Sequence, residues 1–326
     1  MNTPDIVTVT NLSKNYGDFI AVNGISFSIR RGEIFGFLGP NGAGKTTTIN
    51  MMIGLAKPSS GSILIDGIDA VKKVKKAQSI MGIVSDESNL YDEMDGFDNL
   101  CFCGSLYGMK KAIRETRAKE LLEQFGLIQA GKRPFKAYSK GMRRKLTIAA
   151  GIIHKPGMLF LDEPTTGIDV ESARQIRQLL LKLKQEGTTV FITTHYIEDA
   201  ERICDRIAFI AGGSIVASGT VSELMDSVSH GHTIRLTADA NLEPLAGELQ
   251  ARFGGCTVKV ESDHVITLVS EERIALFPVL QYLDSQGVSV FEAKELRPSL
   301  EDVFVKLTGI EAAKLKKEKE KGGAGK

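Results

Sequence analysis

The stretch GPNGAGKTT at residues 39–47 constrains the fold more than any other part of the 326-residue chain. The apolar run EIFGFL (33–38) precedes it, and TTTINMMIGL (46–55) follows it with apolar residues at helical spacing. A strand, a glycine-rich loop and a helix in this order form a phosphate-binding loop, in which backbone N–H groups converge on phosphate oxygens. The sequence therefore predicts an α/β fold with a mainly parallel sheet.

Each side chain of this loop has an expected task. The Lys45 ammonium is expected to contact the β- and γ-phosphates of a nucleotide, and the Thr46 hydroxyl is expected to ligate Mg²⁺. The alternative is a plain strand–turn–helix, which needs no Gly-Lys-Thr at its end. We expect the nucleotide to be bound by Gly39, Asn41, Gly42, Gly44, Lys45, Thr46 and Thr47.

Two further apolar runs end in polar residues. MLFLDEP (158–164) is typical of a parallel strand that is buried on both faces and ends in two acids. Asp162 is expected to hold Mg²⁺, and Glu163 to take a proton from the attacking water. TTVFITTH (188–195) ends in His195, which is expected to contact the γ-phosphate or that water. Because parallel strands end at one edge of the sheet, these residues are expected to meet the phosphate loop there.

A second anion-binding pattern occurs in YSKGMRRKL at 138–146. It combines the hydroxyl of Ser139, the flexible backbone of Gly141 and the start of a helix with a basic run at 143–145. The simpler alternative is a surface helix capped by a serine.

Taken together, these motifs make residues 5–225 resemble the nucleotide-binding subunit of an ABC transporter. Ser139 and Gly141 match the signature motif of that family, whereas Lys140 and Met142 replace its usual Gly and Gln. The resemblance implies that this motif contacts ATP held by the phosphate loop of a second subunit. Two copies, most simply a homodimer, would then enclose two ATP molecules head to tail.

The resemblance assigns three more residues. Asp169, in TGID (166–169), matches the loop that crosses the dimer interface, and Tyr16 matches an aromatic residue that stacks on adenine. The alternative for Tyr16 is a surface position at a strand end. Asp86 stands where the family usually has Gln; it can ligate Mg²⁺ but adds negative charge beside the phosphates.

The rest of the chain suggests two domains and a tail. The first domain (1–225) is expected to contain a helical subdomain at about 88–150, including a helix at 113–126, whose surface near 86–99 docks a membrane permease by resemblance. Residues 226–310 show a β-α-β-β-α-β order, typical of a ferredoxin-like domain, and end in a helix capped by Ser299. We expect a regulatory or dimer-stabilising role for this domain, and disorder in the lysine-rich tail 311–326. Such a C-terminal extension resembles subunits that export drugs, lipids, polysaccharides or ions.

Composition restricts the remaining possibilities. The net charge of +1 gives no reason to expect nucleic acid as a partner. No apolar run reaches the roughly 18 residues of a membrane span, and the N-terminus lacks a signal-peptide pattern, so a soluble chain held at the cytoplasmic face by a permease is expected. The alternatives are an ABC ATPase that acts on nucleic acid or ribosomes, and a GTPase, whose Asn-Lys-x-Asp motif is absent.

Overall fold

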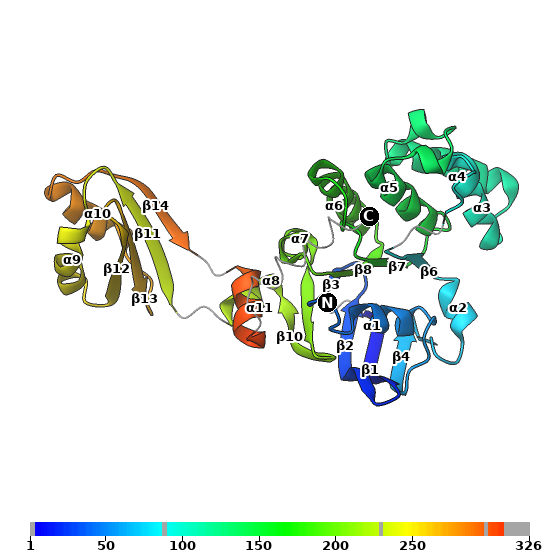
Figure 1. The fold of residues 1–326 in the computed structure, drawn as a ribbon, viewed down its shortest axis with the longest axis horizontal. Coiled ribbons are helices and arrows are strands. Elements are labelled where there is room, and N and C mark those ends of the chain that lie inside the picture. Colours follow the sequence, from blue (N-terminus) through cyan, green and yellow to red (C-terminus); the bar gives the residue numbers. More distant parts are fainter. Residues whose placement is uncertain (1–3, 87–89, 228–230, 297–298, 310–326) are drawn as a thin grey trace. The chain divides into compact units, whose positions relative to one another are not determined.

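The computed structural model describes residues 4–86, 90–227, 231–296 and 299–309. These residues form two compact units (Figure 1). One unit extends to Val221 and resumes at Leu307, and the other comprises Ser222–Lys306. The expected tail at 311–326 lies outside the described residues. No helix in the described part of the chain is both long enough and apolar enough to cross a membrane.

A six-stranded sheet forms the centre of the first unit. All its neighbouring strands are parallel except the pair β9 and β10. Every residue of the strands before the phosphate loop, before His195 and through Asp162 is buried. This confirms the α/β fold, because strands buried on both faces are typical of parallel sheets. In sheet order the strands are β10 (Ser214–Thr220), β9 (Arg206–Ala211), β3 (Ile34–Leu38), β8 (Thr189–Thr194), β7 (Met158–Asp162) and β6 (Met81–Val84).

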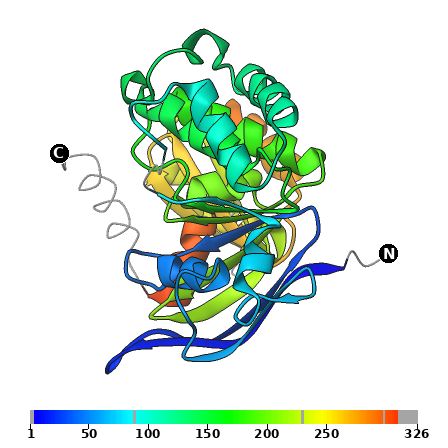
Figure 2. The same cartoon turned by 90° about the vertical axis from the view of Figure 1, so that its right-hand side faces the viewer.

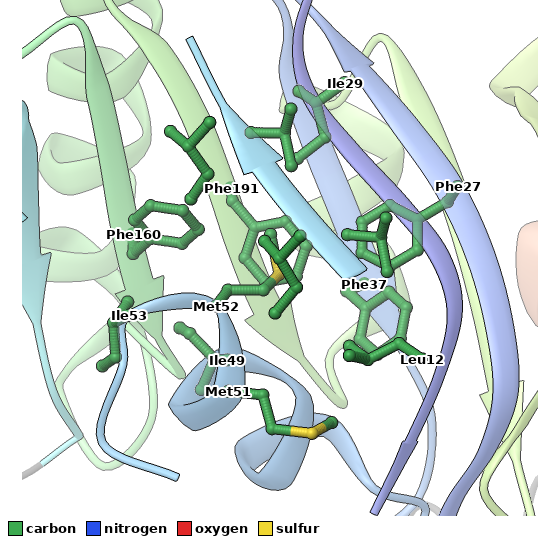
Figure 3. Close-up of a cluster of buried hydrophobic side chains, with 14 of the residues drawn as sticks. Leu12, Phe27, Ile29, Phe37, Ile49, Met51, Met52, Ile53, Phe160 and Phe191 are labelled. Atoms are coloured by element: carbon green, nitrogen blue, oxygen red, sulfur yellow. The ribbon is translucent and has the colours of Figure 1, made fainter. Parts of the chain in front are cut away.

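An antiparallel sheet packs against the parallel one through an apolar core that also contains α1 (Lys45–Met52). Phenylalanines meet at the centre, where the Phe27 ring lies 5.5 Å from that of Phe37 and the Phe160 ring 5.7 Å from that of Phe191 (Figure 3). This core fixes the start of α1 beside the ends of β7 and β8. The strands of the antiparallel sheet are, in order, β2 (Phe19–Arg30), β1 (Asp5–Tyr16), β4 (Ser60–Ile65) and β5 (Ile68–Asp69).

Helices supply the remainder of the first unit. Figure 2 shows α3, α4 and α5 grouped on the side of the parallel sheet opposite the antiparallel strands. In the helix expected at 113–126, Leu121 and Phe125 are buried, but Ile113 is exposed because it lies in the first turn. The helices are α2 (Val74–Gln78), α3 (Gly96–Leu106), α4 (Lys111–Gln124), α5 (Lys140–Gly151), α6 (Val170–Gln185) and α7 (Ile197–Ile203), with 3₁₀ turns at Ile128–Ala130 and Phe135–Ala137.

The second unit has the expected β-α-β-β-α-β order in an antiparallel sheet. Its core is formed by one face of the sheet and two helices. Ser299 caps the final helix, since its hydroxyl accepts a hydrogen bond from the Asp302 N–H at 3.2 Å. The elements are α8 (Val221–Asp226), β11 (His232–Ala238), a 3₁₀ turn (Glu243–Leu245), α9 (Ala246–Arg252), β12 (Cys256–Ser262), β13 (Val265–Ser270), α10 (Leu276–Ser285), β14 (Val290–Leu296) and α11 (Leu300–Thr308), with the sheet order β12-β13-β11-β14.

Candidate nucleotide site

The phosphate loop joins the buried strand β3 to α1, and its geometry requires glycine at two positions. A Cβ at Gly39 would lie 2.2 Å from the backbone oxygen of Ile210. At Gly44, where φ is 105°, a Cβ would lie 2.6 Å from the Ala21 oxygen. Gly44 is the N-cap of α1 and gives no side-chain cap, so the first N–H groups of this helix remain for an anionic ligand.

Lys45 places a buried ammonium group at the centre of this loop. Its Nζ donates hydrogen bonds to the backbone oxygens of Gly39, at 2.8 Å, and Pro40, at 3.2 Å. The same Nζ lies 3.4 Å from Glu163 Oε1, and both side chains are largely buried. The phosphate loop and the end of β7 are therefore joined by one ion pair.

Asp162 ends β7 beside two hydroxyl groups. The hydroxyls of Thr193 and Thr46 donate to its carboxylate. Burial raises the pKa of Asp162, and these two hydrogen bonds partly oppose that effect. The Thr46 hydroxyl and a carboxylate side by side are hard oxygen ligands of the kind that Mg²⁺ prefers.

The site does not contain a complete protein cage for a metal. In the described part of the chain, no three His, Cys, Asp or Glu side chains are grouped in a way that could hold an ion.

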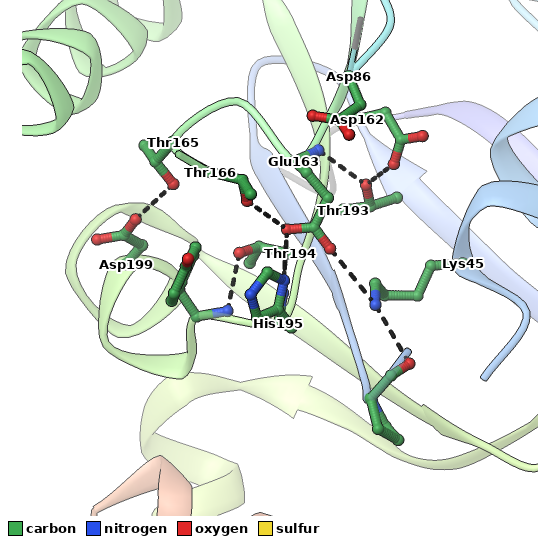
Figure 4. A network of polar contacts seen from close by, with 12 residues as sticks. Lys45, Asp86, Asp162, Glu163, Thr165, Thr166, Thr193, Thr194, His195 and Asp199 are labelled. Carbon is green, nitrogen blue, oxygen red and sulfur yellow. Dashed lines mark hydrogen bonds and ion pairs between the residues drawn. The ribbon is translucent and has the colours of Figure 1, made fainter. Parts of the chain in front are cut away.

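Glu163 turns its carboxylate away from Asp162 and toward His195 (Figure 4). Its Oε2 accepts a hydrogen bond from His195 Nδ1 at 2.8 Å and another from the Thr166 hydroxyl at 3.1 Å. Burial raises the pKa of Glu163, but the His195 hydrogen bond and the Lys45 charge outweigh it, so the pKa lies below its usual value. The result is an ionised carboxylate held in a fixed direction, as a general base requires.

The backbone around Glu163 is also specialised. Glu163 has a φ of +48°, which is uncommon for a residue other than glycine, and its N–H donates to the Thr193 oxygen at 3.1 Å. The following loop is tied to α7, because the Thr165 hydroxyl donates to the Asp199 carboxylate at 2.6 Å. Arg177, which lies in α6, donates to the same carboxylate at 2.6 Å. These contacts join the segment after Glu163, α6 and α7 at one carboxylate.

The expected signature residues have intrachain contacts. Ser139 is exposed and caps α5 by accepting a hydrogen bond from the Met142 N–H at 3.3 Å, which matches the simpler alternative of a capped helix. Gly141 is buried against α6, where a Cβ would lie 2.1 Å from Ser172 Oγ. Asp169 caps α6 by accepting from the N–H and hydroxyl of Ser172 at 2.8 and 2.7 Å. The starts of α5 and α6 are thus packed together.

Arg144 is the residue that sequence reasoning missed. Its guanidinium is buried and donates to the backbone oxygens of Ser85 and Asp86, at 2.8 and 2.7 Å, and to Asp86 Oδ1 at 3.2 Å. The basic run at 143–145 is therefore not one shared face, since Lys145 contacts Gln175. An acid in place of the family's Gln, together with an arginine in the signature helix, was the available signal.

Tyr16 lies at the end of β1, as its alternative interpretation required. Its side chain is 53% exposed, and the Lys14 ammonium lies 4.8 Å from the centre of its ring. The exposed ring leaves a face that can stack on a base.

Comparison with known proteins agrees with this geometry. Residues 22–166 match the family model described as ABC transporter. A linearmycin resistance ATP-binding protein of Bacillus subtilis is 37% identical over 302 residues, covering 92% of this chain and 97% of that protein. A Nod factor export ATP-binding protein of Ralstonia nicotianae is 36% identical and covers 95% of both chains.

A solved structure of a related ATP-binding cassette shows that cassette as a dimer. A dimeric ATP-binding cassette in a post-hydrolysis state, bound to ADP and Pi, aligns with a TM-score of 0.61 and 26% identity. It covers 66% of this chain and 98% of the cassette. The curated relatives extend over both units, whereas this cassette is shorter than the chain. On these similarities, the chain belongs to the ATP-binding subunits of ABC transporters.

Proposed function

We propose that this chain is the ATP-hydrolysing motor subunit of an ABC exporter and that it drives a separate membrane permease. The observation that carries the proposal is the Glu163 carboxylate, which His195 and Lys45 hold beside the phosphate loop. Export is supported by the relatives named for drug resistance and Nod factor export. The similarity covers the second unit as well as the ATP-binding cassette.

The residues suggest how ATP is bound and cleaved. The phosphates are held by the start of α1 and by Lys45. Thr46 and Asp162 would hold Mg²⁺, and the Asp86 carboxylate would supply a further oxygen. When bound, Mg²⁺ supplies positive charge that offsets the charge on the transferred phosphoryl group. Glu163 accepts a proton from the attacking water, and His195, through its other ring nitrogen, positions the γ-phosphate or that water.

The second half of each site is proposed to come from another copy of the chain. In a head-to-tail homodimer, Ser139 and Gly141 of the partner subunit contact the γ-phosphate, and Asp169 lies at the interface. The dimeric cassette among the solved relatives supports this arrangement. The exposed Val170, next to Asp169, is 84% accessible and gives the interface an apolar contact. Tyr16 would stack on the adenine ring.

The permease is proposed to dock on the helical subdomain, at the cytoplasmic face of the membrane. By resemblance we expect this surface near 86–99, where Tyr91 is exposed. A groove of about 640 Å³ lies between α2, β6 and the end of α3 and is lined in part by Ile83, Leu106 and Tyr107. Leu106 is 69% exposed, so a helix with an apolar face has a surface to cover. Nucleic acid is not proposed as a partner, given the net charge of +1.

The substitution Glu163→Gln tests the base. We expect ATP binding to be retained and hydrolysis to fall by about 10²- to 10⁴-fold, because the amide cannot accept the proton. Steady-state phosphate release and equilibrium ATP binding measure the two effects separately. Glu295→Gln is the matched control, since Glu295 is an exposed glutamate that also contacts a histidine. Near-normal turnover in Glu163→Gln would reject Glu163 as the base.

A further inference from the structure

Ser85 and Asp86, which directly follow β6, are held by a buried cation from a distant part of the chain. Arg144 lies in α5, and its side chain is only 9% exposed. It donates to two consecutive backbone oxygens, of Ser85 and Asp86, and also to the Asp86 carboxylate. A guanidinium that is fixed by three hydrogen bonds and removed from water is a costly feature unless negative charge lies nearby.

That negative charge comes from three carboxylates. The charges of Asp86, Asp162 and Glu163 all oppose the lowering of the Arg144 pKa by burial. Asp86 and Glu163 also raise the pKa of Asp162, so both lie close enough to repel its carboxylate. A nucleotide adds further negative charge at the same place.

We propose that Arg144 is a positioning residue that neutralises Asp86 and fixes the loop carrying it, so that metal-bound nucleotide can bind beside an acid at this position. A neutral Gln at position 86 would not need such a cation. The proposal rests on the proposed nucleotide site, and it adds to that site a residue from α5 and a dependence between positions 86 and 144.

Four variants test this dependence: Asp86→Gln, Arg144→Gln, their combination, and Arg143→Gln as the matched control. Arg143 is the neighbouring arginine, but it contacts the Lys136 oxygen at 2.9 Å and Asp92 at 3.4 Å instead of Asp86. Binding of ATP is measured by calorimetry with Mg²⁺ and with EDTA, and the melting temperature of each variant is measured without nucleotide.

We expect Arg144→Gln to weaken binding of MgATP by about tenfold, a size typical of coupled charged neighbours. Adding Asp86→Gln to that variant should restore the affinity to within about threefold of wild type, whereas Asp86→Gln alone should not tighten binding. Arg143→Gln should bind as wild type does. Arg144→Lys, which keeps the charge and loses the two-pronged geometry, should retain part of the affinity.

Two results would overturn the proposal. One is additivity, in which the fold-change in MgATP affinity of the double variant equals the product of the fold-changes of the two single variants. The other is a lower melting temperature for Arg144→Gln with unchanged MgATP affinity, which would make the arginine merely structural. Lys45→Ala distinguishes a failure of this proposal from a failure of the proposed nucleotide site. If Lys45→Ala binds MgATP as tightly as wild type, the proposed nucleotide site is wrong, whatever the Asp86 and Arg144 variants show.

Discussion

Each unit of the molecule contains a histidine that is hydrogen-bonded to a glutamate, and the two pairs differ in their surroundings. The side chains of His195 and Glu163 are 8% and 12% exposed, at 2.8 Å from each other. Those of His232 and Glu295 are 39% and 43% exposed, at 3.1 Å. Water and salt screen the electrostatic attraction within the exposed pair, so that attraction is weak. The buried pair is screened less, and its hydrogen bond fixes the direction of the Glu163 carboxylate. The same two residue types thus form a buried pair beside the phosphate loop in one unit and a surface contact in the other.

The sheets explain why only the first unit buries such a pair. Its parallel strands are covered on both faces and end together, so polar residues that follow β3, β7 and β8 are gathered at one sheltered edge. In the second unit, β11 alternates between buried and accessible residues, because helices cover one face of an antiparallel sheet. Its polar residues are distributed over the open face instead.

From the histidine side, the largest effect that separates the two pairs is expected from His195→Ala. We expect turnover to fall by about 10²-fold, since the base loses its hydrogen-bond donor. Because that hydrogen bond lowers the pKa of Glu163, its removal raises the pKa, and the acid limb of the rate profile moves to higher pH. A pH profile of phosphate release measures both effects.

His232→Ala is the control for that experiment, and it should leave the rate and the acid limb as they are. If His195→Ala changed the rate but left the acid limb in place, the interaction between His195 and the Glu163 carboxylate would not be what sets the protonation of the base.

Gly141 in the first unit and Gly247 in the second are each the second residue of a helix, and substituting them compares the packing of the two units with smaller expected effects. Gly141→Ala in α5 forces a Cβ to within 2.6 Å of the Ser172 Cβ, and we expect a loss of about 1–3 kcal/mol in the free energy of unfolding. Chemical denaturation measures this loss. Ser172→Gly, added as a second change, should recover part of it, and no recovery would place the strain elsewhere.

Gly247→Ala, at the same position of α9, is expected to have the smallest effect and the opposite sign. A Cβ there meets no atom within 4 Å. The substitution should stabilise the second unit by up to about 1 kcal/mol, because alanine favours helix more than glycine does. A calorimetric melting temperature that fell would show that α9 has a neighbour at this position in solution.

The sequence was sufficient for the elements with strong patterns. The continuous apolar runs before Lys45, Asp162 and His195 predicted buried parallel strands, and all three strands are present. The β-α-β-β-α-β order of the second unit could be predicted because its strands and helices differ in the spacing of their apolar residues. Convergence of the three strand ends then follows from the topology of a parallel sheet.

Contacts between distant segments were not readable. Arg144 and Asp86 are separated by 58 positions, so no local spacing or period in the sequence pairs them. The three basic residues at 143–145 are consecutive in the sequence, but on a helix consecutive residues point about 100° apart, and each contacts a different partner. The close approach of Gly141 to Ser172 is likewise a property of how α5 and α6 pack.

That close approach has a mechanical consequence. The hydroxyl of Ser172 occupies the space that the Cβ of any larger residue at position 141 would need. The same hydroxyl donates a hydrogen bond to the Asp169 carboxylate. A shift of the first turn of α5 toward α6 therefore has no free space to enter, and the first turn of α6 is joined to Glu163 by only a few residues.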